Sequence, residues 1–191
     1  LAIGVTGVAL SMFLLSYSFN AATYTLTNDS ISKLPKEINV EQISVLQDKT
    51  FQSDTEFKQA ITQAIGVAAQ KKYESELISA SITMNAMLIL LGILGFVASF
   101  AISLGPVMWV LFSELFPNKI RGIAISFVGF INSAVSFVVQ LVFPWELEKL
   151  GSTLTFLLYG IFALIGLVFI MKLLPETKGK SLEELEAILV K

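Results

Sequence analysis

Apolar residues dominate four long stretches of the chain that contain no charged side chain, at residues 1–19, 86–113, 122–145 and 152–171. A helix rises about 1.5 Å per residue, so crossing the apolar core of a bilayer takes about 20 such residues. We therefore predict an all-α polytopic membrane protein. Its transmembrane helices are expected at residues 1–19, 82–113, 122–145 and 152–174.

The second predicted span is the longest, and it contains Gly105 and Pro106 near its end. Proline has no backbone N–H, and its ring clashes with the preceding turn of a helix. The span is therefore expected to be kinked or broken near residues 105–106. A broken helix inside a membrane is tolerated mainly where it lines a cavity or is buried in protein.

Residues 20–81 form a long polar loop between the first two spans. In residues 54–76, apolar side chains recur at helical spacing among polar ones, at Phe57, Ile61, Ala64, Ile65 and Ala68. This pattern predicts an amphipathic helix. A solvated helix that caps the surface is the favoured interpretation, with a partner or lipid contact as the alternative.

The composition removes several classes of function. Of the 191 residues, 54% are hydrophobic and 15% are charged, and the chain has neither cysteine nor histidine. Thiolate and imidazole nucleophiles, Cys/His metal sites and disulfides are therefore excluded. A net charge of -2 without a basic stripe argues against nucleic acid. We expect no enzyme and no cofactor, and chemistry limited to hydrogen bonding and shape.

Basic residues set the expected orientation. They occur in the predicted turn at 114–121 and in the tail at 175–191, whereas the turn at 146–151 has only Lys149. Short loops rich in Lys and Arg face the cytoplasm. We therefore expect a plasma (inner) membrane protein with a cytoplasmic C-terminus, in which residues 20–81 and 146–151 are extracytoplasmic.

Polar residues in the third span are candidates for binding a solute. Asn132, Ser136 and Gln140 follow one another at intervals of four and so lie along one side of the helix. They either line a cavity or form hydrogen bonds between helices. In the second span, Trp109 follows the Gly105–Pro106 break, and its ring suits stacking on a sugar, although an interfacial anchor is the alternative.

Charged residues at the predicted inner ends are candidates for a conformational gate. Glu114 and Arg121 flank a short turn that contains Pro117. Opposite charges that pair in one conformation only bias an equilibrium between two states. The alternative is a pair of ordinary interface charges. Beyond the fourth span, Ser181 and Glu184 form a capping box, which predicts a short tail helix within residues 175–191.

Three strings carry a resemblance to a known family: Gly105-Pro106-Val107-Met108-Trp109, Ser113-Glu114-Leu115-Phe116-Pro117 with Arg121-Gly122, and residues 175–186. In order and position they resemble the sugar porter family of the major facilitator superfamily, in particular bacterial xylose or hexose proton symporters. The resemblance implies the last four helices of a twelve-helix fold, preceded by further helices of the same protein. Residues 20–81 would be an addition that the family usually lacks.

The resemblance also implies roles for single residues. Trp109 matches a tryptophan that contacts the sugar, Asn132 an amide-bearing contact, and Ser136 a further polar contact, with Gly105 and Pro106 beside them. Glu114, Arg121 and Glu176 match an inner charge network that holds the outward-facing state. Two positions depart from the pattern: Ser133 replaces a second tryptophan, and Met108 replaces a second proline.

The implied function is transport of a monosaccharide across the lipid bilayer by alternating access, with protons as the coupling ion. No ionisable residue interrupts the four apolar cores, so a proton carrier is expected upstream of Leu1. A facilitator without proton coupling, a membrane sugar sensor and a membrane-anchored binding module that uses residues 20–81 are the alternatives.

Overall fold

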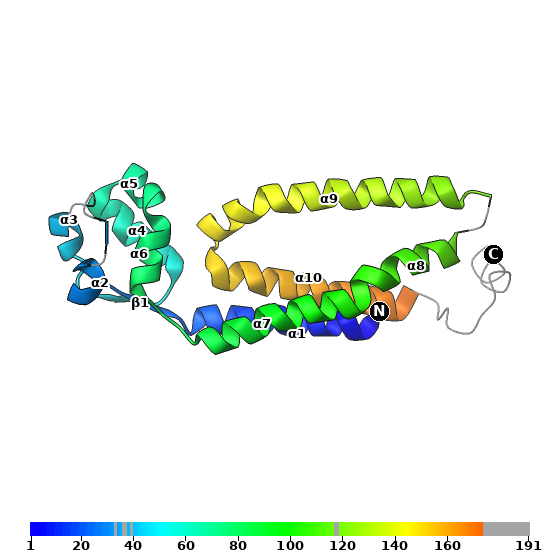
Figure 1. Ribbon diagram of the computed structural model, residues 1–191, viewed down its shortest axis with the longest axis horizontal. Helices are drawn as coiled ribbons and strands as arrows, with labels where there is room; N and C mark the ends of the chain where they lie inside the picture. The colour runs from blue at the N-terminus through cyan, green and yellow to red at the C-terminus, as the bar shows by residue number, and fades with distance from the viewer. Residues whose placement is uncertain (33, 36–37, 39, 117–118, 174–191) are drawn as a thin grey trace. The chain divides into compact units, whose positions relative to one another are not determined.

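The computed structural model describes residues 1–32, 34–35, 38, 40–116 and 119–173 (Figure 1). Four helices are long and apolar enough to cross a membrane: Ala2–Asn20, Ala86–Ser113, Arg121–Lys149 and Gly151–Lys172. The chain is mostly helical and has the four membrane-length helices expected from the sequence. The prediction of an all-α fold is wrong for the segment between the first two spans, which contains a three-stranded sheet. The described chain forms two compact units, residues 1–12, 92–145 and 158–173 in the first, and residues 13–91 and 146–157 in the second.

In the first unit, the start of α1 (Ala2–Asn20) lies beside α7 (Ala86–Ser99) and the π-helical turn η1 (Phe100–Leu104) (Figure 1). Small side chains meet along this contact, in the pairs Gly4–Ser103, Gly7–Ser99 and Ser11–Gly95. The numbers rise on α1 as they fall on the partner, so the two helices are antiparallel. Small residues at these positions let the two backbones approach closely.

The π-helical turn lies immediately before Pro106. The N–H of Gly105 donates to the carbonyl of Phe100, five residues earlier, and Gly105 itself has helical backbone angles. One extra residue in the turn gives the proline ring room that a regular α-helical turn lacks. The prediction of a break at 105–106 is therefore corrected. The irregularity precedes the proline, and α8 (Gly105–Leu115) continues the helix.

The first unit also contains most of α9 (Arg121–Lys149) and of α10 (Gly151–Leu173). Near the end of α9, the ring of Phe143 contacts the ring of Tyr159, with centroids 6.0 Å apart. No side chain of α9 is buried in the described structure. Surface this apolar on a helix of membrane length is suited to lipid or to further helices.

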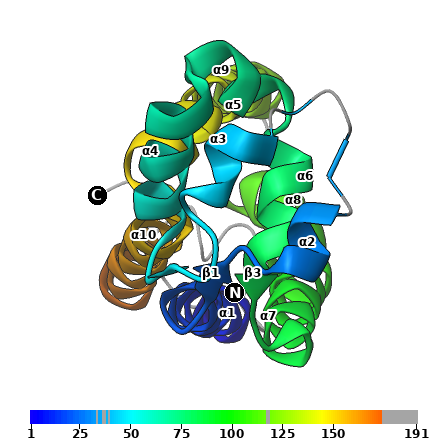
Figure 2. The same cartoon turned by 90° about the vertical axis from the view of Figure 1, so that its left-hand side faces the viewer.

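The second unit contains the interhelical domain, residues 21–85, which connects α1 to α7. Its antiparallel sheet has the order β2-β1-β3, so Tyr24 on the central strand lies between Phe51 and Ile82. The strands β1 and β3 are labelled side by side in Figure 2. The strands are β1 (Thr23–Thr25), β2 (Thr50–Phe51) and β3 (Ile82–Thr83). The helices are α2 (Asn28–Ser32), α3 (Val40–Ser44), α4 (Asp54–Ile65), α5 (Val67–Lys72) and α6 (Glu74–Ser81).

This domain has its own apolar core. Tyr24 stacks on Phe57 with ring centroids 5.5 Å apart, and Ile61 and Leu77 are almost fully buried beside them. Burial of such side chains is the main favourable term in folding. The sequence predicts a loop here with one amphipathic helix, and the structure shows a folded domain.

The predicted single helix over residues 54–76 is divided into α4, α5 and the start of α6. Ser53 caps α4 by accepting from the N–H of Glu56 at 3.2 Å. Gly66 ends α4 with a φ of 82°, a left-handed conformation that glycine adopts without strain. Phe57 and Ile61 pack into the domain's own core, so the apolar face of α4 is covered by the same chain. The predicted tail helix at 175–191 lies outside the described residues.

We predict that Gly4→Ala destabilises the packing of α1 against η1. The added methyl group would collide with the side chain of Ser103 and lie 3.0 Å from the carbonyl oxygen of Ser99. The expected cost is about 1–3 kcal/mol, as for other overpacked sites. Thermal unfolding of the chain in detergent, followed by circular dichroism, measures it. Gly129→Ala is the matched control because a methyl group there meets nothing within 4 Å, and equal effects of the two changes would contradict the prediction.

We predict that Tyr24 makes the interhelical domain sensitive to alkaline pH. Burial, together with the nearby Asp54 carboxylate, raises the pKa of Tyr24 to about 12. In the unfolded chain tyrosine ionises near its usual value of about 10. Between these values only the unfolded state loses the proton, so the free energy of unfolding should fall as the pH rises from about 10 to about 12. Tyr24→Phe should reduce this fall, measured by unfolding across that range, and an unchanged fall would contradict it.

Candidate functional site

Trp109 lies in the middle of α8, one turn after Gly105. Its indole ring is 48% exposed and packs edge-on against Phe112, with centroids 6.0 Å apart and an angle of 90° between the rings. The edge contact restricts the ring without covering it. An aromatic ring that is held in place and partly open can stack on the apolar face of a ligand.

The polar row on α9 lies on an uninterrupted helix. Asn132, Ser136 and Gln140 are exposed, and none makes a hydrogen bond to another described side chain. Pro144 has no N–H to donate to the carbonyl of Gln140, which extends the hydrogen-bonding capacity of this row by one acceptor. These groups therefore supply donors and acceptors for a polar ligand or for a neighbouring helix.

The structure does not join the candidate binding residues of α8 to those of α9. Within the described residues, no hydrogen bond or ring contact connects Trp109 with Asn132 or Ser136. The two helices are linked at one end and diverge from it (Figure 1). Gly105 and Pro106 lie at the start of α8, on the same helix as Trp109.

Arg121 lies at the first residue of α9, where its Nε donates to the carbonyl of Phe116 at 3.1 Å. Phe116 follows the last helical residue of α8, and the final carbonyl groups of a helix have no partner within it. The guanidinium of Arg121 thus provides a hydrogen-bond donor for a carbonyl group at the end of α8, in addition to its charge. The side chain of Glu114 and all of Glu176 lie outside what the structure describes.

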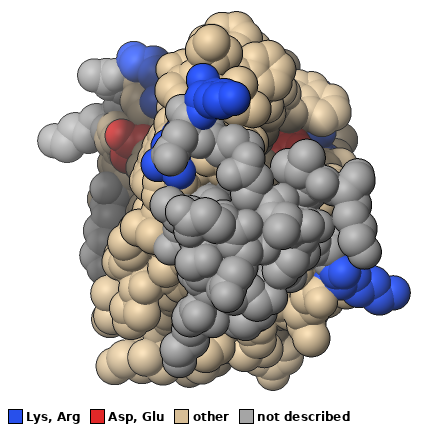
Figure 3. Space-filling model, turned by 90° about the vertical axis from the view of Figure 1, so that its right-hand side faces the viewer, with Lys and Arg blue, Asp and Glu red and all other residues tan. Residues whose placement is uncertain are grey.

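Within the described membrane-length helices, charged side chains lie only near the helix ends. On the face shown in Figure 3, basic and acidic side chains are visible beside uncharged ones that make up most of the described surface. Within the described residues, no group of three or more metal-ligating side chains occurs.

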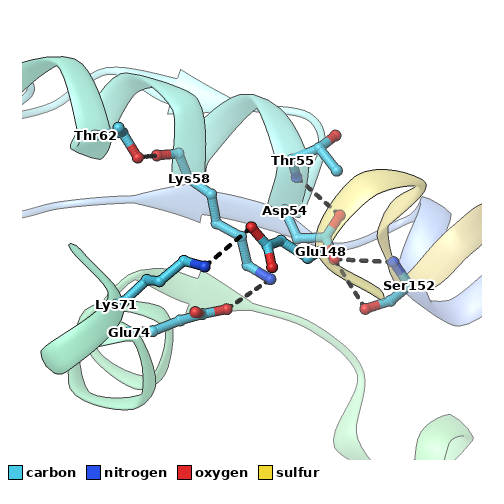
Figure 4. Close-up of polar contacts among 8 residues, drawn as sticks. All are labelled: Asp54, Thr55, Lys58, Thr62, Lys71, Glu74, Glu148 and Ser152. Atoms are coloured by element: carbon cyan, nitrogen blue, oxygen red, sulfur yellow. Dashed lines mark hydrogen bonds and ion pairs between the residues drawn. The ribbon is translucent and has the colours of Figure 1, made fainter. Parts of the chain in front are cut away.

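The second unit contains a polar contact, between Asp54 and Ser152, that the sequence did not predict. Asp54 at the start of α4 accepts two hydrogen bonds from Ser152 in the first turn of α10, one from the backbone N–H and one from the hydroxyl, both 2.9 Å (Figure 4). Its other carboxylate oxygen accepts from the N–H of Thr55 at 2.9 Å. Ninety-eight positions separate Asp54 and Ser152, so no local motif could reveal this contact.

Four apolar helices of membrane length, with charge only at their ends, define an integral membrane protein. The family model described as "Sugar (and other) transporter" matches residues 60–189. This match covers more than half of the 191 residues, and the chain belongs to this family of sugar transporters.

Relatives include the probable metabolite transport protein CsbC of Bacillus subtilis, 47% identical over 87 residues, which are 46% of this chain and 19% of the relative. The D-xylose-proton symporter of Escherichia coli K12 is 41% identical over 105 residues, 52% of this chain and 21% of the relative. The facilitated glucose transporter member 10 of Xenopus tropicalis is 41% identical over 97 residues, with shares of 51% and 18%. All three are named as transporters.

A crystal structure of a double-tryptophan mutant of XylE is similar in fold, with a TM-score of 0.59 and 28% sequence identity. The match covers 98% of this chain and 28% of the XylE chain. The aligned regions span about a fifth of the length of the curated relatives.

Proposed function

We propose that this chain acts within a longer sugar transporter that moves a monosaccharide across the membrane by alternating access. The family match over residues 60–189 carries the proposal. The similarity to the D-xylose-proton symporter supports a monosaccharide as the substrate and protons as the coupling ion. The interhelical domain would then be extracytoplasmic, and the C-terminus would face the cytoplasm of a cell bounded by this plasma membrane.

In this proposal Trp109 stacks on the sugar, and Asn132 and Ser136 bind its hydroxyl groups. The exposed indole ring and the unpaired side chains on α9 support these roles. Because α8 and α9 do not join these residues, the remaining walls of the site come from further helices of the complete protein. Gly105 and Pro106 position Trp109 through the π-helical turn before them.

Arg121, Glu114 and Glu176 form the inner gate in this proposal. The hydrogen bond from Arg121 to Phe116 already connects the end of α8 to the start of α9. A charged group that bridges two helix ends can stabilise one conformation more than the other. These three residues would therefore control how much of the protein is in the outward-facing state. They would not contact the sugar, so changing them should leave sugar binding intact.

Trp109→Ala in the complete protein should raise the half-saturating sugar concentration about tenfold, which corresponds to about 1.4 kcal/mol. The loss of an aromatic face that contacts the sugar is the physical reason. Uptake of labelled xylose, glucose, galactose and arabinose by cells, with and without a protonophore, measures the effect and names the substrate. Inhibition by the protonophore supports proton symport, and its absence supports a facilitator.

Trp145→Ala is the matched control for this experiment. Trp145 is the other tryptophan of the chain, is also about half exposed, and lies near the opposite end of α9 from Arg121. It should affect uptake little. Equal losses from the two changes would contradict sugar binding by Trp109, and no uptake of any of the four sugars by the unaltered protein would contradict the proposed function.

Arg121→Glu should impair uptake and shift the complete protein towards the inward-facing state, while sugar binding persists. Reversing the charge removes the donor to Phe116 and puts a carboxylate where this proposal needs a cation to pair with Glu114 and Glu176. The accessibility of single introduced cysteines to a thiol reagent from each side of the membrane measures the conformational shift. Equilibrium binding of labelled sugar measures whether the sugar site is intact. Lys119→Glu reverses an exposed charge two residues away and serves as the control. Unchanged uptake kinetics in Arg121→Glu would make Arg121 an interface anchor.

A further inference from the structure

The first turn of α10 obtains its hydrogen-bond partner from a distant part of the chain. The first N–H groups of a helix have no partner within it, and a side-chain oxygen normally caps them from the residue just before the helix. Here Leu150, the residue before α10, and Gly151, its first residue, have no side-chain acceptor, and Asp54 of the interhelical domain accepts from Ser152 instead (Figure 4). A carboxylate is well suited to this place because the N-terminus of a helix carries partial positive charge.

The contact between Asp54 and α10 requires glycine at position 151. Its φ is 78°, in the left-handed region, and a Cβ atom on it would lie 2.5 Å from Oδ1 of Asp54. Asp54 is only 8% exposed although it carries charge. A buried carboxylate is costly unless it is well paired, and the three hydrogen bonds from Ser152 and Thr55 provide that pairing.

The last turns of α1 contact the same part of α10. The hydroxyl of Ser16 donates to the carbonyl of Thr153 at 2.9 Å, and Phe19 stacks on Phe156 with ring centroids 5.4 Å apart and nearly parallel rings. These contacts and the Asp54 cap all lie in the second unit. The end of α1, the start of α10 and the interhelical domain are thus held together by partly buried contacts.

An ion pair beside the cap contributes much less. Lys71 and Glu148 are 3.3 Å apart and about half exposed, at the edge of an open polar cleft of about 320 Å³ that Lys58 and Glu74 also line. Exposed pairs of this kind add little because water and salt screen them. The attachment of the domain to α10 therefore depends chiefly on Asp54.

We propose that the interhelical domain is a brace. Through Asp54 it holds the first turn of α10 against the last turns of α1, so that these helix ends move as one body during transport. This proposal rests on the proposed function, because alternating access moves groups of helices against one another as largely rigid bodies. A helix end that loosens separately would transmit less of that movement.

The test compares Asp54→Ala, Asp54→Asn and Ser152→Ala in the complete protein. Hydrogen–deuterium exchange of peptides covering residues 150–157 reports the cap directly, and labelled-sugar uptake reports transport. Asp54→Ala should increase exchange in this segment about fivefold, the effect expected for loss of a helix cap. It should also lower the maximal uptake rate about threefold or more with little change in KM, because Asp54 is not among the proposed sugar contacts.

The other variants separate the cap from a general loss of folding. Both hydrogen bonds from Ser152 go to one carboxylate oxygen, which an asparagine amide oxygen can replace, so Asp54→Asn should have an intermediate effect. Ser152→Ala removes only the hydroxyl donor and should have a smaller effect than Asp54→Ala. Glu76→Gln changes an exposed carboxylate on α6 and is the matched control, with no expected effect on either measurement.

The outcomes distinguish this proposal from the proposed function. Unchanged exchange at residues 150–157 in Asp54→Ala would overturn the brace, whatever the uptake. Faster exchange with an unaltered uptake rate would overturn its role in transport. If the unaltered protein takes up none of the sugars, the proposed function fails, and with it the role of the brace in transport, whereas the exchange result still decides whether Asp54 holds α10.

Discussion

A helix in an apolar medium must satisfy its own backbone hydrogen bonds. At three places in this structure a helix cannot do so in the regular way, and the chain compensates differently at each. Pro106 cannot donate to the preceding turn, and a π-helical turn adjusts the chain before it. The carbonyl of Phe116 follows the end of α8, and Arg121 donates to it. The start of α10 lacks a local cap, and Asp54 of the interhelical domain supplies one. Two of these three interruptions recruit a contact that joins separate elements, and the three coincide with the proposed binding segment, gate and brace.

Hydrophobic patterning was sufficient to predict the four membrane-length helices, because an uncharged run of this length has few alternatives to a helix in a bilayer. It was insufficient for the interhelical domain. The strands of that domain are only two or three residues long, too short for an alternating pattern to stand out, and their pairing joins residues as distant as Tyr24 and Ile82. The division of residues 54–76 could have been anticipated at Gly66, since glycine commonly ends helices. The π-helical turn has no signal of its own beyond the proline that follows it.

The candidate site is divided in the same way. Trp109, Asn132 and Ser136 are exposed on their helices, and motifs alone made them candidates. In the proposed function, their assembly into one cavity depends on further helices of the complete protein, which no local pattern in this chain encodes. Asp54 shows the opposite case, because it is buried and fully engaged but lies in an ordinary polar segment of the sequence. Motifs therefore point to exposed candidate contacts, whereas a buried residue such as Asp54 becomes visible only through its long-range packing.

The sheet of the interhelical domain has a consequence for how such a domain could be gained. The strand that follows α1, β1, pairs directly with the strand that precedes α7, β3, with Thr23 opposite Thr83. The chain therefore enters and leaves the domain at neighbouring points. Domains with adjacent ends can be inserted into a host fold without displacing the elements they interrupt. A short reverse turn between β1 and β3 would join α1 to α7 at the same two neighbouring points that the whole domain now joins.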